Sequence, residues 1–203
     1  MNEHDKSDRE PNKARRTLVV ATSVVGGAAA VGAAVPFAAS MWPSERARAA
    51  GAPVKVDVSG LAPGELQVVE WRGKPVWVMR RSQEMIASLK TDEARLSDPD
   101  SEASEQPPYA ENEYRSRTPE LMVLVGVCTH LGCSPQEKPA SAKAEMGADW
   151  PGGFYCPCHG SKFDFAGRVF KGSPAPLNLV VPPYTVLADG TVVVGEDEKT
   201  KGA

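Results

Sequence analysis

Two short segments of the chain concentrate the residue types that bind metal ions in proteins. The first box is CTHLGC, residues 128–133, and the second box is CPCHGS, residues 156–161. Together they contain every cysteine of the chain and two of its three histidines. Each box pairs one thiol with one imidazole, so the two boxes can supply a single site with four ligands. The candidate ligands are Cys128, His130, Cys156 and His159, and the remaining thiols are Cys133 and Cys158.

Three kinds of metal centre are compatible with these residue types. A zinc site with two cysteines and two histidines is the first, although the usual order, CxxC followed by HxxxH, is absent. An all-cysteine [2Fe–2S] cluster is the second, but its plant-type spacing matches only at Cys128 and Cys133. The third is a [2Fe–2S] cluster with two cysteines on one iron and two histidines on the other. The residues alone leave all three open.

The two boxes resemble those of Rieske iron–sulfur proteins, of the subtype with an additional disulfide. Together with an apolar segment near the N-terminus, the chain is similar to the Rieske subunits of bacterial cytochrome bc1 complexes. The resemblance extends over the organisation of the whole chain and is most specific across residues 121–178.

The resemblance implies one [2Fe–2S] cluster of Rieske type and a role for each candidate residue. Two cysteines bind the inner iron and two histidines bind the outer, more exposed iron. The two remaining thiols form a disulfide that joins the two boxes, which an oxidising compartment allows to persist. The implied ligands are Cys128 and Cys156, then His130 and His159, and the implied disulfide is Cys133–Cys158.

Residues around the boxes are expected to tune and shield the cluster. In the family a serine at the end of the second box donates its hydroxyl to a bridging sulfide, and Ser161 matches it. A tyrosine two residues later commonly donates to a cysteine sulfur, but Phe163 stands there and has no hydroxyl. We therefore predict a lower potential than in relatives with tyrosine, while Phe163 also packs beneath the cluster. Leu131, Gly172 and Pro174 resemble the loops that shield the cluster from water.

The ligand set indicates electron transfer at high potential. Neutral imidazoles leave the centre less negative than thiolates do, which places Rieske potentials at about −150 to +300 mV, against about −400 mV for plant-type ferredoxins. An exposed ligand histidine can also exchange a proton when the iron changes oxidation state. Quinol oxidation requires this coupling, because quinol releases a proton together with each electron.

The resemblance implies a subunit of ubiquinol–cytochrome c reductase, a translocase in which this chain is not catalytic alone. One electron passes from ubiquinol to the cluster and then to cytochrome c1. His159 hydrogen-bonds the quinol and couples the proton, with His130 beside it. The implied partners are cytochrome b and cytochrome c1 in a dimeric, membrane-embedded complex.

The sequence is compatible with two alternatives. The chain is compatible with the Rieske subunit of another exported oxidoreductase, such as arsenite oxidase. It is also compatible with a membrane-tethered zinc-binding structural module that transfers no electron, which metal analysis would reveal. The formal net charge of −3, without a basic stripe, argues against nucleic-acid binding.

The N-terminus predicts export and anchoring. No ionisable side chain occurs from Thr17 to Ser44, a run longer than the roughly 20 residues that cross a membrane. Arg15 and Arg16 precede it, as in a Tat export signal, with a Sec signal or a plain anchor as alternatives. Trp42 suits a membrane interface. We expect a single-pass anchor in a bacterial inner membrane with the head in the periplasm.

The predicted organisation is a membrane anchor followed by a mainly β head. Residues 1–16 are a disordered cytoplasmic tail, 17–43 a transmembrane helix and 44–53 a hinge or tether. Residues 54–203 form a soluble, antiparallel β Rieske head, with a small cluster-binding subdomain at about residues 125–178.

Alternating patterns and turn residues predict the elements of the head. Strand, hairpin and helix patterns occur at residues 54–58, 65–80 around Gly73, 82–90 after Ser82, 121–127, 163–170, and around Asp189-Gly190. Residues 134–152 read as a polar loop. Residues 91–119 are acidic and rich in serine and proline, so we predict a surface insertion or partner-facing loop without a packed core.

Overall fold

The computed structural model describes residues 12–91 and 93–197, and the chain divides between Arg48 and Ala49 into two compact units. Most of the predicted tail, including His4, lies outside the described residues.

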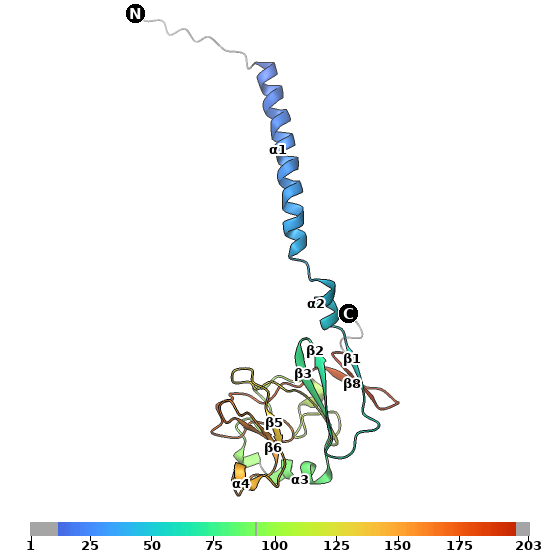
Figure 1. Cartoon of the computed structure of the whole chain (residues 1–203), viewed down its shortest axis with the longest axis vertical. Coiled ribbons are helices and arrows are strands. Elements are labelled where there is room, and N and C mark those ends of the chain that lie inside the picture. Colours follow the sequence, from blue (N-terminus) through green and yellow to red (C-terminus); the bar gives the residue numbers. More distant parts are fainter. Residues whose placement is uncertain (1–11, 92, 198–203) are drawn as a thin grey trace, which may run out of the picture. The chain divides into compact units, whose positions relative to one another are not determined.

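The first unit contains one long apolar helix, α1, Lys13–Ser40 (Figure 1). Asn12 caps it, because its side-chain oxygen accepts hydrogen bonds from the backbone amides of Ala14 and Arg15. The helix continues through Pro36, and no residue of α1 is buried. Its length and a mean hydropathy of 2.1 in its most apolar window are sufficient for a membrane span. The helix includes Arg15 and Arg16, which we had placed in the tail.

The second unit is a head built from three antiparallel sheets of three strands each (Figure 1). The first sheet has the order β1 (Val54–Asp57), β9 (Thr191–Val194), β8 (Tyr184–Val186). The second has the order β2 (Leu66–Trp71), β3 (Lys74–Arg80), β4 (Leu121–Val125). The third has the order β5 (Gln136–Lys138), β6 (Gly153–Tyr155), β7 (Lys162–Phe163). The helical segments are α2 (Glu45–Ala50), which crosses the boundary between the two units, α3 (Gln83–Thr91), α4 (Lys143–Met146), η1 (Glu93–Arg95) and η2 (Pro108–Ala110). The predicted mainly β head with an N-terminal apolar helix is confirmed.

Local sequence explains the predicted elements that the structure contains. The β2–β3 turn places Arg72 and Gly73 at φ 53° and 71°, the left-handed conformation that favours glycine and suits a tight hairpin. The hydroxyl of Ser82 accepts a hydrogen bond from the Met85 amide at the start of α3. Four of the five residues of β4 are buried, as its continuous apolar run predicted.

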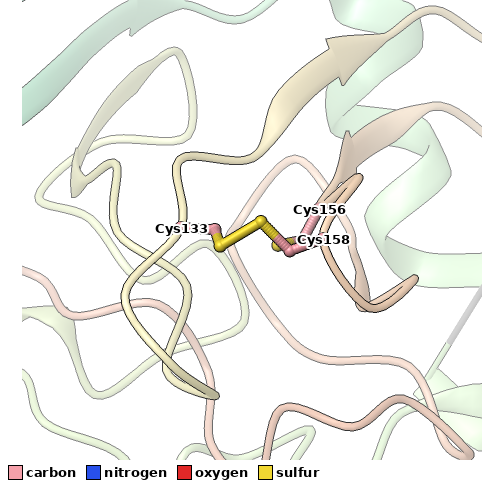
Figure 2. Close-up of side chains that lie close together, drawn as sticks. All are labelled: Cys133, Cys156 and Cys158. Atoms are coloured by element: carbon pink, nitrogen blue, oxygen red, sulfur yellow. A yellow bond between two sulfur atoms is a disulfide. The ribbon is translucent and has the colours of Figure 1, made fainter.

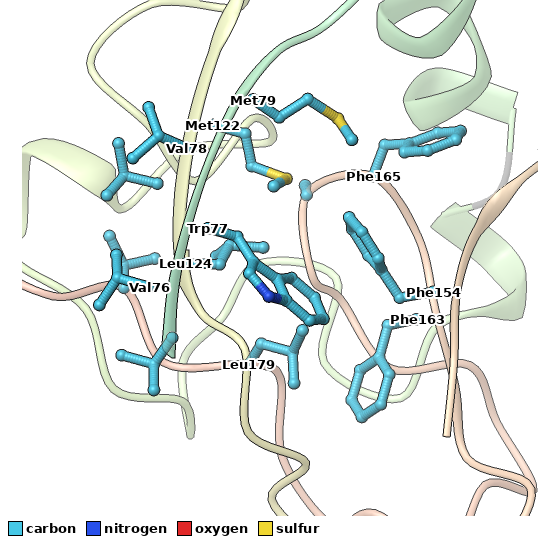
Figure 3. Close-up of a cluster of buried hydrophobic side chains, with 14 of the residues drawn as sticks. Val76, Trp77, Val78, Met79, Met122, Leu124, Phe154, Phe163, Phe165 and Leu179 are labelled. Atoms are coloured by element: carbon cyan, nitrogen blue, oxygen red, sulfur yellow. The ribbon is translucent and has the colours of Figure 1, made fainter. Parts of the chain in front are cut away.

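A shared hydrophobic core joins the second sheet to the third, which leads into the second box (Figure 3). The ring of Trp77 in β3 lies 4.7 Å from that of Phe154 in β6, measured between centroids. Phe154 pairs with Phe163 of β7 across the third sheet. A β-carbon at Gly126 would collide with the Trp77 indole, so only glycine fits where the chain leaves β4 for the first box.

Two expectations about loops were wrong. The predicted polar loop at residues 134–152 contains β5 and α4, elements too short for a periodic pattern to reveal. Residues 91–119 do pack into the head, since Leu96, Ala110, Arg115 and Ser116 are each at most 2% exposed. Buried hydrogen bonds to polar side chains hold this segment, and composition does not disclose such partners.

Candidate metal centre

The two boxes fold into closed loops of the same backbone design. In the first, the Cys128 amide donates to the Cys133 carbonyl at 2.8 Å, and the Gly132 amide donates to the Cys128 carbonyl at 3.0 Å. The second box repeats both hydrogen bonds at 2.8 and 2.9 Å with Cys156, Ser161 and Gly160. Gly132 and Gly160 have φ of 84° and 82°, which a side chain rarely tolerates. Each glycine thus permits the turn that presents the ligands.

A disulfide joins the boxes at Cys133 and Cys158, as predicted, with the two Cα atoms 6.6 Å apart (Figure 2). The sulfur of Cys156 lies within 4.8 Å of both disulfide sulfurs. Those two sulfurs are bonded to each other and cannot act as thiolate ligands. The sulfurs that remain free to bind a metal belong to Cys128 and Cys156.

The four candidate ligands are graded in burial. Cys128 and Cys156 are 3% and 2% exposed, whereas His130 is half-buried and His159 is exposed. The two imidazole rings face each other edge to face, with centroids 4.7 Å apart. The site therefore has a thiol pair on the inside and an imidazole pair at the surface. This set fits a binuclear cluster with thiolates on one iron and imidazoles on the other.

Burial and hydrogen bonding have opposite effects on the pKa of the Cys128 thiol at the inner end of the site, and the effect of burial is the larger. Burial raises the pKa of the Cys128 thiol, and hydrogen bonds from the His130 amide and the Ser161 hydroxyl oppose that effect. The neighbouring Cys156 thiol also raises the pKa of Cys128. A bound metal ion relieves both penalties, because it replaces the thiol protons.

A third segment, the proline loop of residues 172–179, is hydrogen-bonded to both boxes. The Thr129 hydroxyl donates to the Leu177 carbonyl at 2.6 Å. The Ala175 amide donates to the Ser161 hydroxyl oxygen at 3.0 Å. Gly172 and Pro174 lie exposed in this loop, and Leu131 of the first box is 71% exposed.

Phe163 is fully buried in the hydrophobic core (Figure 3). Sequence reasoning missed Thr129, whose hydroxyl bonds the Leu177 carbonyl of the proline loop, and Asn178, whose side chain connects the end of that loop to Val169. A hydroxyl residue between two ligands was a usable signal for Thr129, whereas no local pattern marks Asn178.

Two family models match the chain. A family model described as "Rieske [2Fe-2S] domain" matches residues 111–184. A second model, "Ubiquitinol-cytochrome C reductase Fe-S subunit TAT signal", matches residues 4–44 and confirms the Tat prediction drawn from the paired arginines.

Relatives that match most of the chain have names consistent with these two family models. The "Ubiquinol-cytochrome c reductase iron-sulfur subunit" of Allochromatium vinosum is 58% identical, over 90% of this chain and 88% of the relative. The protein of that name from Rhodospirillum rubrum is 41% identical, over 95% of this chain and 98% of the relative. A solved structure of a "Hyperthermophilic respiratory Complex III" is 26% identical, with a TM-score of 0.47, covering 86% of this chain and 98% of that one.

Proposed function

This chain belongs to the family of Rieske iron–sulfur subunits of ubiquinol–cytochrome c reductase. From that membership we propose which of its residues bind the cluster, contact the quinol and tune the reduction potential. The protein is an electron carrier with a Rieske [2Fe–2S] cluster, working within the cytochrome bc1 complex. The relatives do not favour an arsenite oxidase-like partner or a zinc-binding module.

Cys128 and Cys156 are the inner ligands, and His130 and His159 are the outer ligands. The gradient of burial from the thiols to the imidazoles is the single observation that carries this assignment. The bound cluster supplies one-electron chemistry at high potential between quinol and cytochrome c1. Buried thiolates keep the inner end dry, and the imidazoles bring the outer end within reach of a partner.

His159 is the ligand that forms the hydrogen bond with the quinol. It is the more exposed of the two imidazoles, so a ring nitrogen not bound to iron can face a molecule outside the head. That nitrogen accepts the hydrogen bond and the proton of the quinol, while His130, half-buried beside it, completes the pair. The disulfide limits movement of the two boxes against each other during electron uptake.

Ser161 tunes the potential. Its hydroxyl oxygen accepts from the Ala175 amide, which leaves the hydroxyl hydrogen available for a sulfur in the site. Such a hydrogen bond stabilises the more negative, reduced state.

The protein is a membrane-anchored subunit of the complex, through the apolar helix near its N-terminus. The finer organisation completes the proposal: an inner-membrane anchor at residues 17–43, a tether at 44–53, and a periplasmic head that contacts cytochrome b and cytochrome c1 in a dimeric complex. The tether lets the head move between these two partners. Proline substitutions within it are expected to slow turnover while the cluster remains intact, and normal turnover would contradict a moving head.

Iron, acid-labile sulfide and the EPR spectrum of the ascorbate-reduced protein test the ligand assignment on one sample. We expect two irons and two sulfides per chain, as the cofactor requires, with a rhombic signal of low average g. A cluster that stays silent until dithionite is added would indicate all-cysteine ligation. Zinc without sulfide would overturn electron transfer altogether.

A further inference from the structure

Asn178, at the end of the proline loop, is 1% exposed, and its side-chain oxygen, side-chain nitrogen and backbone amide all have hydrogen-bond partners. Its side-chain oxygen accepts from the Val169 amide at 2.8 Å. Its side-chain nitrogen donates to the Asp98 carbonyl at 2.8 Å and to the Ser101 hydroxyl at 2.9 Å. Its backbone amide donates to the Ser104 hydroxyl at 3.0 Å. One side chain thus connects Val169, after the second box, to Ser101, which lies 77 residues before Asn178 in the chain.

The earlier segment around Ser101 is held in place by hydrogen bonds of its own. The Asp98 carboxylate accepts from the Ser104 hydroxyl at 2.6 Å and from the Glu102 amide at 2.9 Å. Ser101 adopts φ 57°, a left-handed conformation that is costly for a side chain, and is 2% exposed. A costly conformation persists where surrounding contacts over-determine it. We call residues 98–104 the bracket.

Further contacts extend this connection along the proline loop. Arg115, 1% exposed, donates to the Leu179 carbonyl at 2.6 Å and to the side-chain oxygen of Gln106 at 3.0 Å. The side-chain nitrogen of Gln106 donates in turn to the Ser101 carbonyl at 2.6 Å. The end of the proline loop is therefore held by the segment whose role the sequence left unexplained.

Two residues in the middle of the proline loop, Ala175 and Leu177, are hydrogen-bonded to the two boxes. Ala175 donates its amide to Ser161, and Leu177 accepts from Thr129, so a displacement of the loop changes the partner of the Ser161 hydroxyl. We propose that Asn178 is a positioning residue for electron transfer, and that the bracket sets the hydrogen bond of Ser161 through Asn178 and the proline loop. This inference rests on the proposed function, because it concerns the hydroxyl that tunes the cluster.

Matched serine variants provide the test in the full-length protein with its cluster. Ser104→Ala removes a hydroxyl that accepts from Asn178 and donates to Asp98. The control, Ser116→Ala, removes a hydroxyl with the same two roles in the same segment, accepting from Arg81 and donating to the Thr118 carbonyl. No hydrogen bond described for Ser116 reaches the proline loop. Asn178→Ala is the stronger variant, and Ser104→Ala decides the question if Asn178→Ala does not fold.

The first readout is the midpoint potential. We expect Asn178→Ala to weaken electron binding about threefold, which is about 30 mV for a one-electron couple and less than the loss expected from Ser161→Ala, because Asn178 acts through the Ser161 hydroxyl. Ser104→Ala is expected to lower the potential by less, and Ser116→Ala to lower the unfolding temperature with the potential unchanged. The inference is overturned if Asn178→Ala and Ser104→Ala lower the unfolding temperature alone, or if Ser116→Ala shifts the potential equally.

The second readout does not depend on the cluster's activity. Ala175 lies between Pro174 and Pro176, which have no amide hydrogen, so hydrogen exchange of a short peptide isolates its amide. Exchange at Ala175 should accelerate in Ser104→Ala and stay unchanged in Ser116→Ala, and equal rates in both would reject the bracket. Ser161→Ala distinguishes the proposed tuning by Ser161 from the proposed role of the bracket. If it leaves the potential unchanged, the proposed tuning by Ser161 fails; if it lowers the potential and the Asn178 variants do not, the bracket fails alone.

Discussion

The two boxes share one backbone design and differ in what their hydroxyl groups do. Thr129 of the first box uses its hydrogen for the Leu177 carbonyl, whereas Ser161 of the second box accepts from the Ala175 amide. Only the second hydroxyl keeps a hydrogen for the cluster. The second box also exposes Cys158 and His159, while His130 is half-buried. Two loops of the same form thus differ in their contacts: the first donates a hydrogen bond to the proline loop, and the second accepts one from it and carries the roles proposed above for Ser161 and His159.

The largest expected effect treats the two boxes alike. Cys128→Ser and Cys156→Ser should each abolish the cluster, because each removes one of the two thiolates proposed for the inner iron. Iron per chain and the EPR signal measure the loss. A variant that retained a full cluster would exclude its cysteine from the ligand set. Ser134→Ala, in the exposed loop after the first box, serves as a control that should load normally.

Removal of the link between the boxes should come next in size. The double variant Cys133→Ser/Cys158→Ser opens a loop spanning 25 residues, so we expect a loss of about 3 kcal/mol of stability. Thermal loss of the EPR signal measures it, and the double variant avoids a stray single thiol. If the temperature at which half of the EPR signal is lost did not change, the hydrogen bonds within each box would suffice to hold the site.

The difference between the two hydroxyls predicts different redox consequences. Ser161→Ala should lower the potential by about 60 mV, since a hydrogen bond to a charged acceptor contributes about 1.5 kcal/mol. Thr129→Val keeps the shape of the side chain and should mainly loosen the proline loop, with a smaller shift. Redox titration of both variants gives the comparison. Equal shifts would show that both hydroxyls act only through the loop.

The smallest expected effect sharpens the role of the second box. Phe163→Tyr should raise the potential by roughly 30 mV, if the added hydroxyl donates to a cysteine sulfur. The gain is limited because Phe163 is fully buried, so the hydroxyl must also be desolvated. A potential that did not rise would reduce Phe163 to a packing residue. Phe165→Tyr, at another buried phenylalanine of the same core, controls for the effect of a new hydroxyl.

Some features of the site follow from short stretches of sequence. The spacing of cysteine and histidine in each box, with a glycine at the turn, already identifies the candidate ligands and the two remaining thiols. The β2–β3 hairpin and the cap of α3 were predictable for the same reason, since neighbouring residues determine a turn or a cap.

Other features depend on contacts between residues far apart in the chain. The sequence alone indicated an acidic segment without a core at residues 91–119, yet Arg115 and Ser101 are buried there, because distant carbonyl and side-chain groups satisfy their hydrogen bonds. The different uses of the Thr129 and Ser161 hydroxyls likewise become visible only when the proline loop lies against both boxes. Residue types and spacing by themselves confined the candidate ligands to the cysteines and histidines of the two boxes, and the family resemblance divided them into ligands and a disulfide. The tertiary structure decided which hydroxyl has a hydrogen to offer it, because a buried polar group takes its role from whichever partner the fold brings to it.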